Sequence, residues 1–132
     1  MTNTLLISLI VGLGGFVGTL ARYGLSVLSQ RLAIGWPFGT LAANVLGCFA
    51  IGLLTALFTR EATVSPVIRL ALVTGFCGGF TTMSSMIYET VEMIRASEYL
   101  HASLYAAGSF LLSMVGFFAG VMVLRILIKI CG

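Results

Sequence analysis

Charged residues divide this chain into four long uncharged stretches. The stretches are 21, 28, 19 and 26 residues long, and they run over Met1–Ala21, Leu32–Thr59, Leu70–Tyr88 and Tyr99–Leu124. An α-helix needs about 20 apolar residues to cross the hydrocarbon core of a bilayer. Each stretch is long enough for one crossing. The pattern therefore predicts four transmembrane helices, over about residues 5–28, 38–58, 66–95 and 101–129.

The composition strengthens this prediction of an all-α integral membrane protein with a single transmembrane domain, residues 1–132. Hydrophobic residues make up 59% of the chain, charged residues only 8%, and the mean hydropathy is +1.12. Soluble domains carry about 25% charged residues, so an ordinary soluble protein is excluded. The first basic residue is Arg22, and a cleavable signal needs a basic region before its apolar segment. We therefore expect the first stretch to remain as a helix.

The third stretch contains a segment that weakens a helix near its centre. The segment reads GFCGGFTTMSSM and spans Gly75–Met86, with glycines followed by four hydroxyl side chains. Irregular backbone at membrane depth is tolerated only where protein covers it or where it lines a cavity. The carbonyls that such a break releases are suitable ligands for a cation like Na⁺. We expect a break in this helix, and a merely kinked packing helix is the alternative.

Polar side chains recur at helical spacing on the second and fourth stretches. Thr40 and Asn44 lie four residues apart on the second stretch, and Tyr105, Ser109 and Ser113 have the same spacing on the fourth. Residues four apart share one helix face. Such a face of hydroxyl and amide groups suits a small anion that accepts hydrogen bonds, although the same oxygens also suit a small cation. The simpler alternative is that each hydroxyl bonds a carbonyl of its own helix.

The chain has almost no charge asymmetry to orient it in a membrane. One side of the expected helices carries Arg60, Arg69, Arg125 and Lys129, and the other carries Arg22, Arg31 and Arg95. Orientation normally follows an excess of Lys and Arg on one side. The near balance permits insertion in both directions, and hence an antiparallel homodimer.

Three pairs of small residues also sit four apart, at Gly14 and Gly18, Ala43 and Gly47, and Gly116 and Gly120. Such pairs let helices approach closely in lipid. They fit either contacts between subunits or packing within one subunit.

The sequence resembles the Fluc (CrcB) family of bacterial fluoride channels, over nearly its whole length. The resemblance rests on GGFVGTLARY at Gly14–Tyr23, PFGTLAANVLGCFAIG at Pro37–Gly52, the GFCGGFTTMSSM segment followed by Glu89, and the hydroxyl series on the fourth helix. These motifs occur in order on the four expected helices. The resemblance implies a fluoride-selective channel that exports fluoride passively across the bacterial inner membrane and protects against its toxicity.

The family resemblance also implies an assembly and a set of site residues. The assembly is an antiparallel dual-topology homodimer with two pores and a structural Na⁺ between the subunits. Backbone carbonyls of Gly78 and Thr81 correspond to the Na⁺ ligands, Arg22 to a vestibule arginine and Glu89 to the acidic residue after the break. The expected fluoride path comprises Thr40, Asn44, Thr82, Met83, Ser84, Ser85, Met86, Tyr105, Ser109 and Ser113.

Two of these positions depart from the family pattern. Met83 and Met86 stand where the family carries phenylalanine. Aromatic ring edges are electropositive and face the fluoride path in the family. A thioether is apolar and flexible, so conduction in this chain depends on whether methionine replaces the ring edges adequately.

Two other functions remain as alternatives from sequence. A small dual-topology multidrug-type exporter needs a carboxylate within the membrane, and Met1–Ala21 contains no acidic residue. A membrane subunit that only packs against other proteins has no use for the polar helix faces. The chain shows no nucleophile–base pair or metal-ligand constellation, and we expect neither an enzyme nor a nucleic-acid-binding protein. The expected partners are the lipid bilayer, fluoride, Na⁺ and a second copy of the chain.

Overall fold

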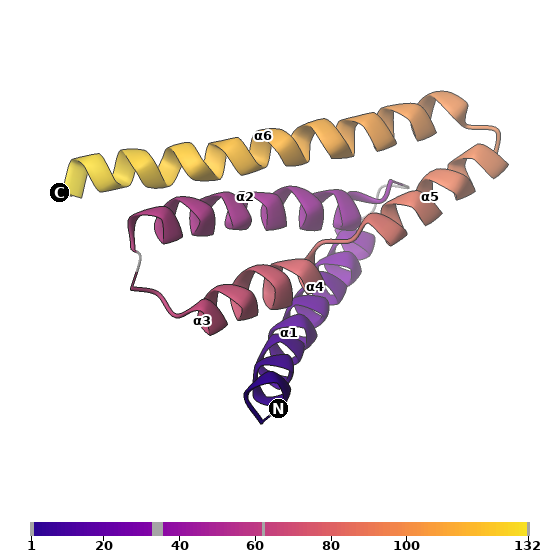
Figure 1. Cartoon of the computed structure of the whole chain (residues 1–132). Helices are drawn as coiled ribbons and strands as arrows, with labels where there is room; N and C mark the ends of the chain where they lie inside the picture. The colour runs from indigo at the N-terminus through magenta and orange to yellow at the C-terminus, as the bar shows by residue number, and fades with distance from the viewer. Residues whose placement is uncertain (1, 33–35, 62, 132) are drawn as a thin grey trace.

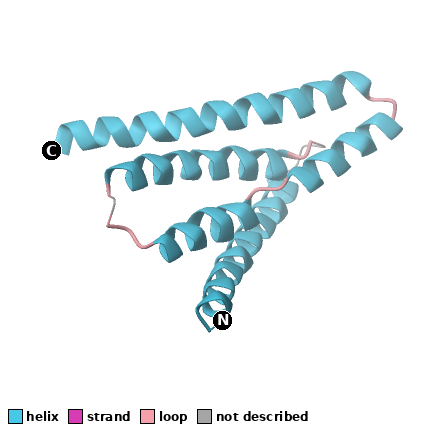
Figure 2. Cartoon of the chain, viewed as in Figure 1, coloured by secondary structure: helices cyan, strands magenta, loops and turns pink. Residues whose placement is uncertain are grey.

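The computed structural model describes residues 2–32, 36–61 and 63–131. All regular structure in this part of the chain is helical (Figure 1, Figure 2). Four helical segments are long and apolar enough to cross a membrane, over Asn3–Leu32, Phe38–Arg60, Pro66–Arg95 and Tyr99–Ile130. These segments contain the four predicted ranges, so the prediction of an all-α, four-span membrane protein is confirmed at this level. Residues 33–35 of the first connection lie outside the described residues.

The first two spans are single helices, α1 (Thr2–Leu32) and α2 (Phe38–Arg60). Proline directly precedes α2, and proline is also the first residue of α3 (Pro66–Leu70). Proline suits a helix start because the first N–H groups of a helix have no helical partner. The Ser65 side chain caps α3 by accepting a hydrogen bond of 3.3 Å from the Val67 N–H. Local sequence thus sets these helix boundaries.

The third span is irregular. A π-helical turn, η1 (Ala71–Cys77), follows α3 and leads into the short α4 (Gly78–Phe80). Thr81 and Thr82 then adopt extended backbone angles, with ψ of 156° and 118°, before α5 (Met83–Arg95) begins. The Thr82 hydroxyl caps α5 by accepting a hydrogen bond of 3.2 Å from the Ser85 N–H. The chain closes with α6 (Tyr99–Cys131).

Two helix pairs form the interior. α2 and α6 lie side by side along most of α2, and α1 crosses η1 and α4 (Figure 1). Glycine permits both approaches: a Cβ atom on Gly18 would collide with the Phe76 carbonyl oxygen, and one on Gly120 with the Phe49 carbonyl oxygen. The small-residue pairs therefore pack helices within one chain.

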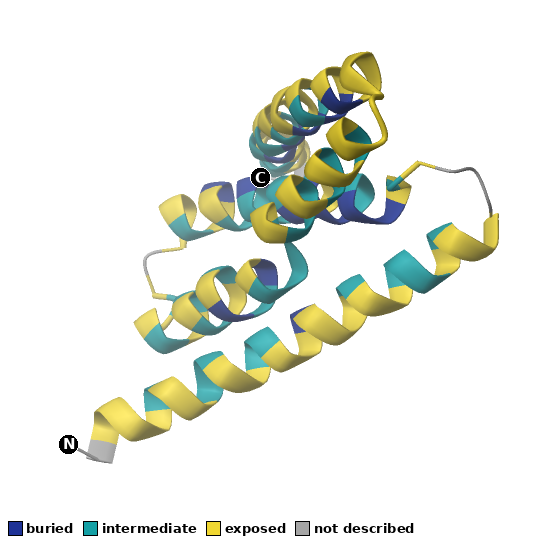
Figure 3. Ribbon diagram, turned by 90° about the vertical axis from the view of Figure 1, so that its right-hand side faces the viewer, coloured by how far each residue is buried: buried dark blue, intermediate teal, exposed yellow. Residues whose placement is uncertain are grey.

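The residues buried in this chain are small. Apart from Tyr105, the buried hydrophobic side chains are alanine and cysteine: Ala43, Ala56, Cys77 and Ala102. Most large apolar side chains are exposed, and exposed positions cover the outer faces of the helices (Figure 3). In a membrane protein such an apolar surface faces lipid or another subunit. The small buried residues let the helices pack closely against one another. The polar side chains of Thr40, Asn44 and Ser109 are buried as well.

Candidate functional site

Asn44 joins α2 to the extended residues of the third span. Its side-chain amide donates a hydrogen bond of 3.1 Å to the Thr82 carbonyl oxygen, and its side-chain oxygen accepts one of 2.7 Å from the Thr82 N–H. Both partners belong to a backbone that has left helical geometry, and buried backbone groups need a replacement partner. Asn44 supplies it from a neighbouring helix.

This arrangement frees backbone carbonyls next to the extended residues. In a continuous helix the Thr82 N–H would bond the Gly78 carbonyl, and the Ser85 N–H would bond that of Thr81. Here the Thr82 N–H bonds Asn44, and the Ser85 N–H bonds the Thr82 hydroxyl. The Gly78 and Thr81 carbonyls, which are the expected Na⁺ ligands, thus lose their helical donors.

The donor set at this point fits a small hard cation. Backbone carbonyls are oxygen ligands, and Na⁺ is bound by such carbonyls where membrane helices unwind. Within the described residues, no group of three or more His, Cys, Asp or Glu side chains could hold a metal ion. A cation at this place would therefore depend on backbone oxygens, and Gly78 is exposed at the surface of the single chain.

A cavity of about 200 Å³ lies beside the extended residues. It brings together the expected residues Asn44, Thr82, Met83, Met86, Ser109 and Ser113, with Thr81, Cys48 and Phe110. Its lining contains hydroxyl groups, an amide, thioethers and a thiol, and none of its side chains carries a full charge. Such a cavity offers hydrogen bonds to a ligand but no ion pair.

Ser109 has an unusual environment in this cavity. Its side chain is only 1% exposed, and its hydroxyl has no hydrogen-bond partner within the described part of the chain. Most serine hydroxyls in membrane helices bond a carbonyl one turn back, as Ser103 does to Tyr99 at 2.9 Å. A buried hydroxyl without a partner costs about 1–3 kcal/mol. Ser109 therefore retains an unused donor for a ligand.

A second polar cluster lies one helical turn away. One Glu89 carboxylate oxygen accepts a hydrogen bond of 2.7 Å from the Thr40 hydroxyl, and the other accepts one of 2.5 Å from the Tyr105 hydroxyl. Thr40 and Tyr105 are buried, with 5% and 2% exposure. Glu89 therefore ties α5 to both α2 and α6.

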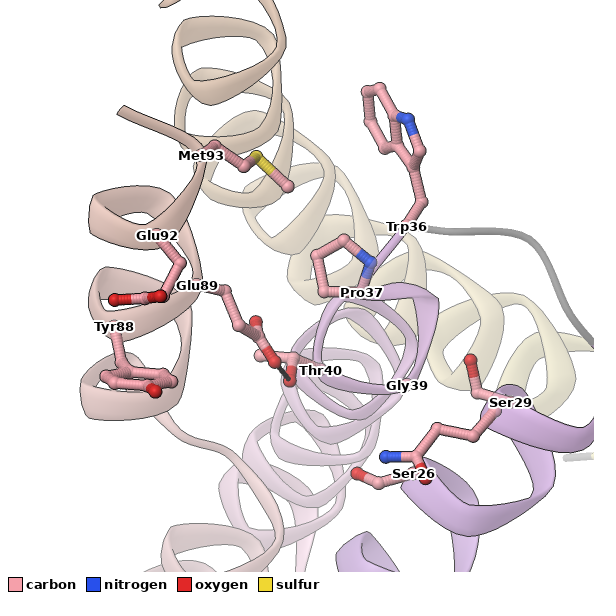
Figure 4. Close-up of a pocket in the computed structure, with 11 residues that line it drawn as sticks. Ser26, Ser29, Trp36, Pro37, Gly39, Thr40, Tyr88, Glu89, Glu92 and Met93 are labelled. Atoms are coloured by element: carbon pink, nitrogen blue, oxygen red, sulfur yellow. Dashed lines mark hydrogen bonds between the residues drawn. The ribbon is translucent and has the colours of Figure 1, made fainter. Parts of the chain in front are cut away.

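This cluster borders a larger pocket, of about 670 Å³, between α1, the start of α2, and α5. Figure 4 shows Glu89 reaching from α5 towards Thr40, while Ser26 and Ser29 belong to α1 on the other side of the pocket. Glu89 and Thr40 line this pocket together with Glu92. Thr40 does not line the smaller cavity, although it was expected to line a single path together with the residues of that cavity.

The two sites lie in sequence along α2 and α6. These helices run in the same direction, with both starting at the right of Figure 1. Thr40 precedes Asn44 by four residues on α2, and Tyr105 precedes Ser109 by four residues on α6. Four residues advance a helix by about 6 Å. The polar faces of α2 and α6 therefore form a series that leads from the larger pocket to the smaller cavity.

Arg22 lies beside the third span. Its Nε atom donates a hydrogen bond of 3.2 Å to the Gly79 carbonyl, which also accepts one of 3.4 Å from the Thr19 hydroxyl. The Gly79 carbonyl would bond Met83 in a continuous helix. Arg22 thus satisfies a carbonyl next to the extended residues and lines neither cavity described above.

Ser84 and Ser85 occupy the first turn of α5 and line neither cavity. The Ser84 hydroxyl lies 3.1 Å from that of Thr82, and the Ser85 hydroxyl accepts a hydrogen bond of 3.2 Å from it. These hydroxyls lie around the N-terminal cap of α5 and do not belong to the polar series of α2 and α6.

Sequence reasoning did not identify Cys48, Phe110 or the contact of Glu89 with Thr40 and Tyr105. Cys48 lies four residues after Asn44 and Phe110 follows Ser109, so helical spacing and adjacency were the available signals. Glu89 is separated from Thr40 by 49 residues and from Tyr105 by 16. No local pattern relates residues so far apart, and only the packing of α5 against the other helices does so.

Comparison with known proteins identifies the relatives of this chain. Residues 9–121 match the family described as CrcB-like protein, Camphor Resistance (CrcB). A Chlorobium phaeobacteroides protein named fluoride-specific ion channel FluC is 46% identical over 112 residues, which cover 85% of this chain and 87% of that protein. A protein of the same name from Chlorobaculum tepidum is 44% identical over 118 residues, covering 89% of this chain and 94% of its own length.

A more distant relative gives the same result. The protein named fluoride-specific ion channel FluC from Rhizobium etli is 40% identical over 122 residues, covering 92% of this chain and 98% of that protein. The family match over residues 9–121 includes parts of all four spans and the positions of the polar series and of Thr81 and Thr82. The chain is therefore a multi-pass membrane protein that belongs to the CrcB family.

Proposed function

We propose that this chain is the subunit of a fluoride channel that lets fluoride leave the cell passively across the bacterial inner membrane and so protects against fluoride toxicity. Its relatives at 40–46% identity are named fluoride-specific ion channels. The polar series of α2 and α6 gives this proposal a physical basis in the residues of this chain.

The unpartnered hydroxyl of Ser109 is the observation that carries the proposal. It is buried in a cavity with the Asn44 amide and the Ser113 hydroxyl, and the cavity lacks charged side chains. Fluoride is small and accepts strong hydrogen bonds, so neutral donors replace part of its hydration shell. The absence of a fixed cation in the lining lets the anion leave again, because conduction requires weak binding as well as entry.

The active channel, in this proposal, is an antiparallel homodimer with dual topology. Met83 borders the small cavity and is 65% exposed in the single chain, so one chain does not enclose the path. A second subunit would cover this side. The near-equal distribution of Lys and Arg between the two sides of the membrane supports insertion in both directions.

The third span, Pro66–Arg95, acts in this proposal as one transmembrane helix interrupted at Thr81 and Thr82, with a structural Na⁺ beside the interruption. The carbonyls of Gly78 and Thr81 would hold the ion, since their helical donors are engaged elsewhere. A Na⁺ coordinated by these carbonyls from both subunits would hold the two subunits together. Asn44 and Arg22 hold the neighbouring backbone in position.

The sodium proposal has its own test, which does not depend on conduction. We expect the thermal unfolding midpoint of the purified protein to fall when Na⁺ is replaced by N-methylglucamine at equal ionic strength, because a ligand bound only to the folded state stabilises it. Equal midpoints in both cations would contradict a structural Na⁺.

Ion efflux from liposomes tests the channel itself. We expect proteoliposomes to release fluoride rapidly, as followed with a fluoride electrode, and to release little chloride in a parallel assay. Comparable release of both ions would contradict fluoride selectivity, and intact protein that releases neither would contradict the channel.

The exporter alternative is not favoured. Such a carrier needs a carboxylate in the first span, and that span contains none before Arg22. Glu89 is instead on α5, where it accepts two hydrogen bonds.

A further inference from the structure

A basic hollow lies at the opposite end of α2 and α6 from the Glu89 pocket. It has a volume of about 670 Å³ and is lined by Ala56, Thr59, Arg60, Arg125, Ile128 and Lys129. We call these six residues the basic hollow. Three of its side chains are cationic and none is acidic, and they come from two helices that are distant in sequence.

The charges in the basic hollow are only partly neutralised. Arg60 approaches Glu61 at 3.7 Å, but both side chains are about half exposed, at 52% and 49%, and such pairs are weak. Within the described residues, neither Arg125 nor Lys129 forms an ion pair. The C-terminal ends of two helices contribute about half a negative charge each. Among the described side chains, the three cations of the basic hollow are therefore opposed by one carboxylate, that of Glu61.

The geometry of the basic hollow suits a phosphate group. Arg125 and Lys129 are four residues apart and so share one face of α6, and Arg60 faces them from the last turn of α2. Arginine binds phosphate oxygens in pairs, and lysine acts as a point charge. The Thr59 hydroxyl donates its proton to the Thr55 carbonyl at 2.8 Å, so the three cations supply the contacts to phosphate.

The position of the basic hollow in the membrane indicates which phosphate-bearing molecule it fits. The basic hollow lies at the ends of two spans, Phe38–Arg60 and Tyr99–Ile130, so it is at the level of lipid headgroups. Ala56, one turn before Arg60 on α2, is apolar and lies on its membrane side. Exposed Leu57 and Met122, which precede Arg60 and Arg125 on their helices, continue an apolar surface towards the membrane centre. A phospholipid presents its phosphate and its acyl chains in this order.

We propose that Arg60, Arg125 and Lys129 form a binding site for the headgroup of an anionic phospholipid. Arg125 and Lys129 lie beyond residues 9–121, the part of the chain that matches the family. The site is separate from the polar series and does not depend on fluoride conduction. Each basic residue near an anionic lipid surface contributes about fivefold to binding.

Native mass spectrometry of the full-length protein in detergent tests this site. The probes are phosphatidylglycerol and phosphatidylcholine with identical acyl chains, and inorganic phosphate as a third ligand. We expect phosphatidylglycerol to remain bound in preference to phosphatidylcholine. Replacing both residues in Arg125→Gln/Lys129→Gln should weaken phosphatidylglycerol binding by about 25-fold, from two contributions of about fivefold.

The control is Arg31→Gln. It removes an exposed arginine from the C-terminal end of α1, near the start of α2 and away from the basic hollow, and it should leave phosphatidylglycerol binding unchanged. If the double variant does not fold, Lys129→Gln alone should weaken binding about fivefold, and Lys129→Arg should retain it. Equal retention of the two lipids, or an undiminished phosphatidylglycerol complex in the neutral variants, would overturn the proposal. Displacement of the lipid by millimolar inorganic phosphate would identify a free-phosphate site instead, and would also overturn it.

Discussion

Both polar groups of the Asn44 side-chain amide form hydrogen bonds with one residue, Thr82. No aliphatic or hydroxyl side chain of similar size offers a donor and an acceptor in this arrangement. The pair lets the backbone leave the helix inside the membrane, where an unpaired N–H or C=O is costly. Asn44 therefore holds the extended residues open and lines the cavity beside them.

Replacing this residue in Asn44→Ala should stop or strongly reduce fluoride efflux. Two hydrogen bonds to Thr82 are lost, each worth about 1 kcal/mol, which corresponds to at least a tenfold change in the occupancy of the native arrangement. Efflux from liposomes and the oligomeric state by size-exclusion chromatography are measured together. Normal efflux from intact protein would show that Asn44 does not belong to the ion path.

Glu89 is the second residue whose contacts define the site. We expect Glu89→Gln to destabilise the protein by about 1–3 kcal/mol, because glutamine replaces one accepting oxygen with an NH2 group, so that the Thr40 or the Tyr105 hydroxyl loses the acceptor for its proton. The measurement is the thermal or denaturant unfolding of the purified protein.

Glu92→Gln is the matched control on the same helix. Glu92 forms an exposed ion pair of 2.8 Å with Arg95, and such a pair is worth up to about 1 kcal/mol. If the two variants lose equal stability, the contacts of Glu89 do not hold the helices together as described.

The two methionines of the small cavity lead to a prediction about rate. The variant Met83→Phe/Met86→Phe should conduct fluoride faster than the native chain, because aromatic ring edges are electropositive and thioethers lack such an edge. Initial rates of fluoride and chloride efflux are compared for both proteins at equal reconstitution density. A slower variant, in protein that elutes as the native oligomer, would indicate that the methionines are adapted to this pore.

At the scale of elements, glycine decides how closely the helices pack. α1 meets η1 and α4 through Gly14 and Gly18, and α2 meets α6 through Gly52 and Gly120. At each of these contacts a backbone carbonyl occupies the place of a missing side chain. Close backbone contact of this kind is how transmembrane helices associate without a hydrophobic driving force.

The substitution Gly18→Ala should therefore destabilise the protein by about 1–3 kcal/mol, the usual cost of overpacking. Its methyl group would collide with the Phe76 carbonyl and would lie 2.9 Å from the Phe80 backbone nitrogen. Unfolding of the purified variant gives the measurement.

Gly12→Ala provides the control, because nothing lies within 4 Å of a Cβ atom at Gly12. It should be neutral or stabilising by up to about 1 kcal/mol through helix propensity. A Gly18→Ala protein as stable as the Gly12→Ala protein would contradict close packing of α1 on the third span.

At the scale of the whole molecule, the charge balance between the two membrane sides predicts dual topology. Reporter fusions at the C-terminus should detect the native chain on both sides of the membrane. The variant Glu61→Lys/Thr63→Lys adds two cations to the side that already carries four, against three on the other. We expect most copies to adopt one orientation, with a loss of channel activity through lack of oppositely oriented partners.

Glu61→Gln/Thr63→Gln controls for changes in the connection that do not add positive charge, and it should keep both orientations. A native C-terminus detected on one side only would rule out the antiparallel dimer.

The sequence by itself determined the elements of this protein. Insertion depends on the length and apolarity of each segment, which are local properties, so the charged clusters predict the four spans closely. Local spacing also identified the polar faces of α2 and α6, because residues four apart share a helix face whatever the helix packs against.

Only the tertiary structure decided which of these groups meet. Asn44 reaches Thr82 across 38 residues, and Glu89 joins α2 to α6. These contacts depend on the rotation and relative height of each helix, which close packing of small residues sets and which no local pattern encodes. For the same reason the sequence left the glycine pairs open between subunit contacts and internal packing. Their collision with backbone atoms of the same chain becomes evident only when the helices stand side by side.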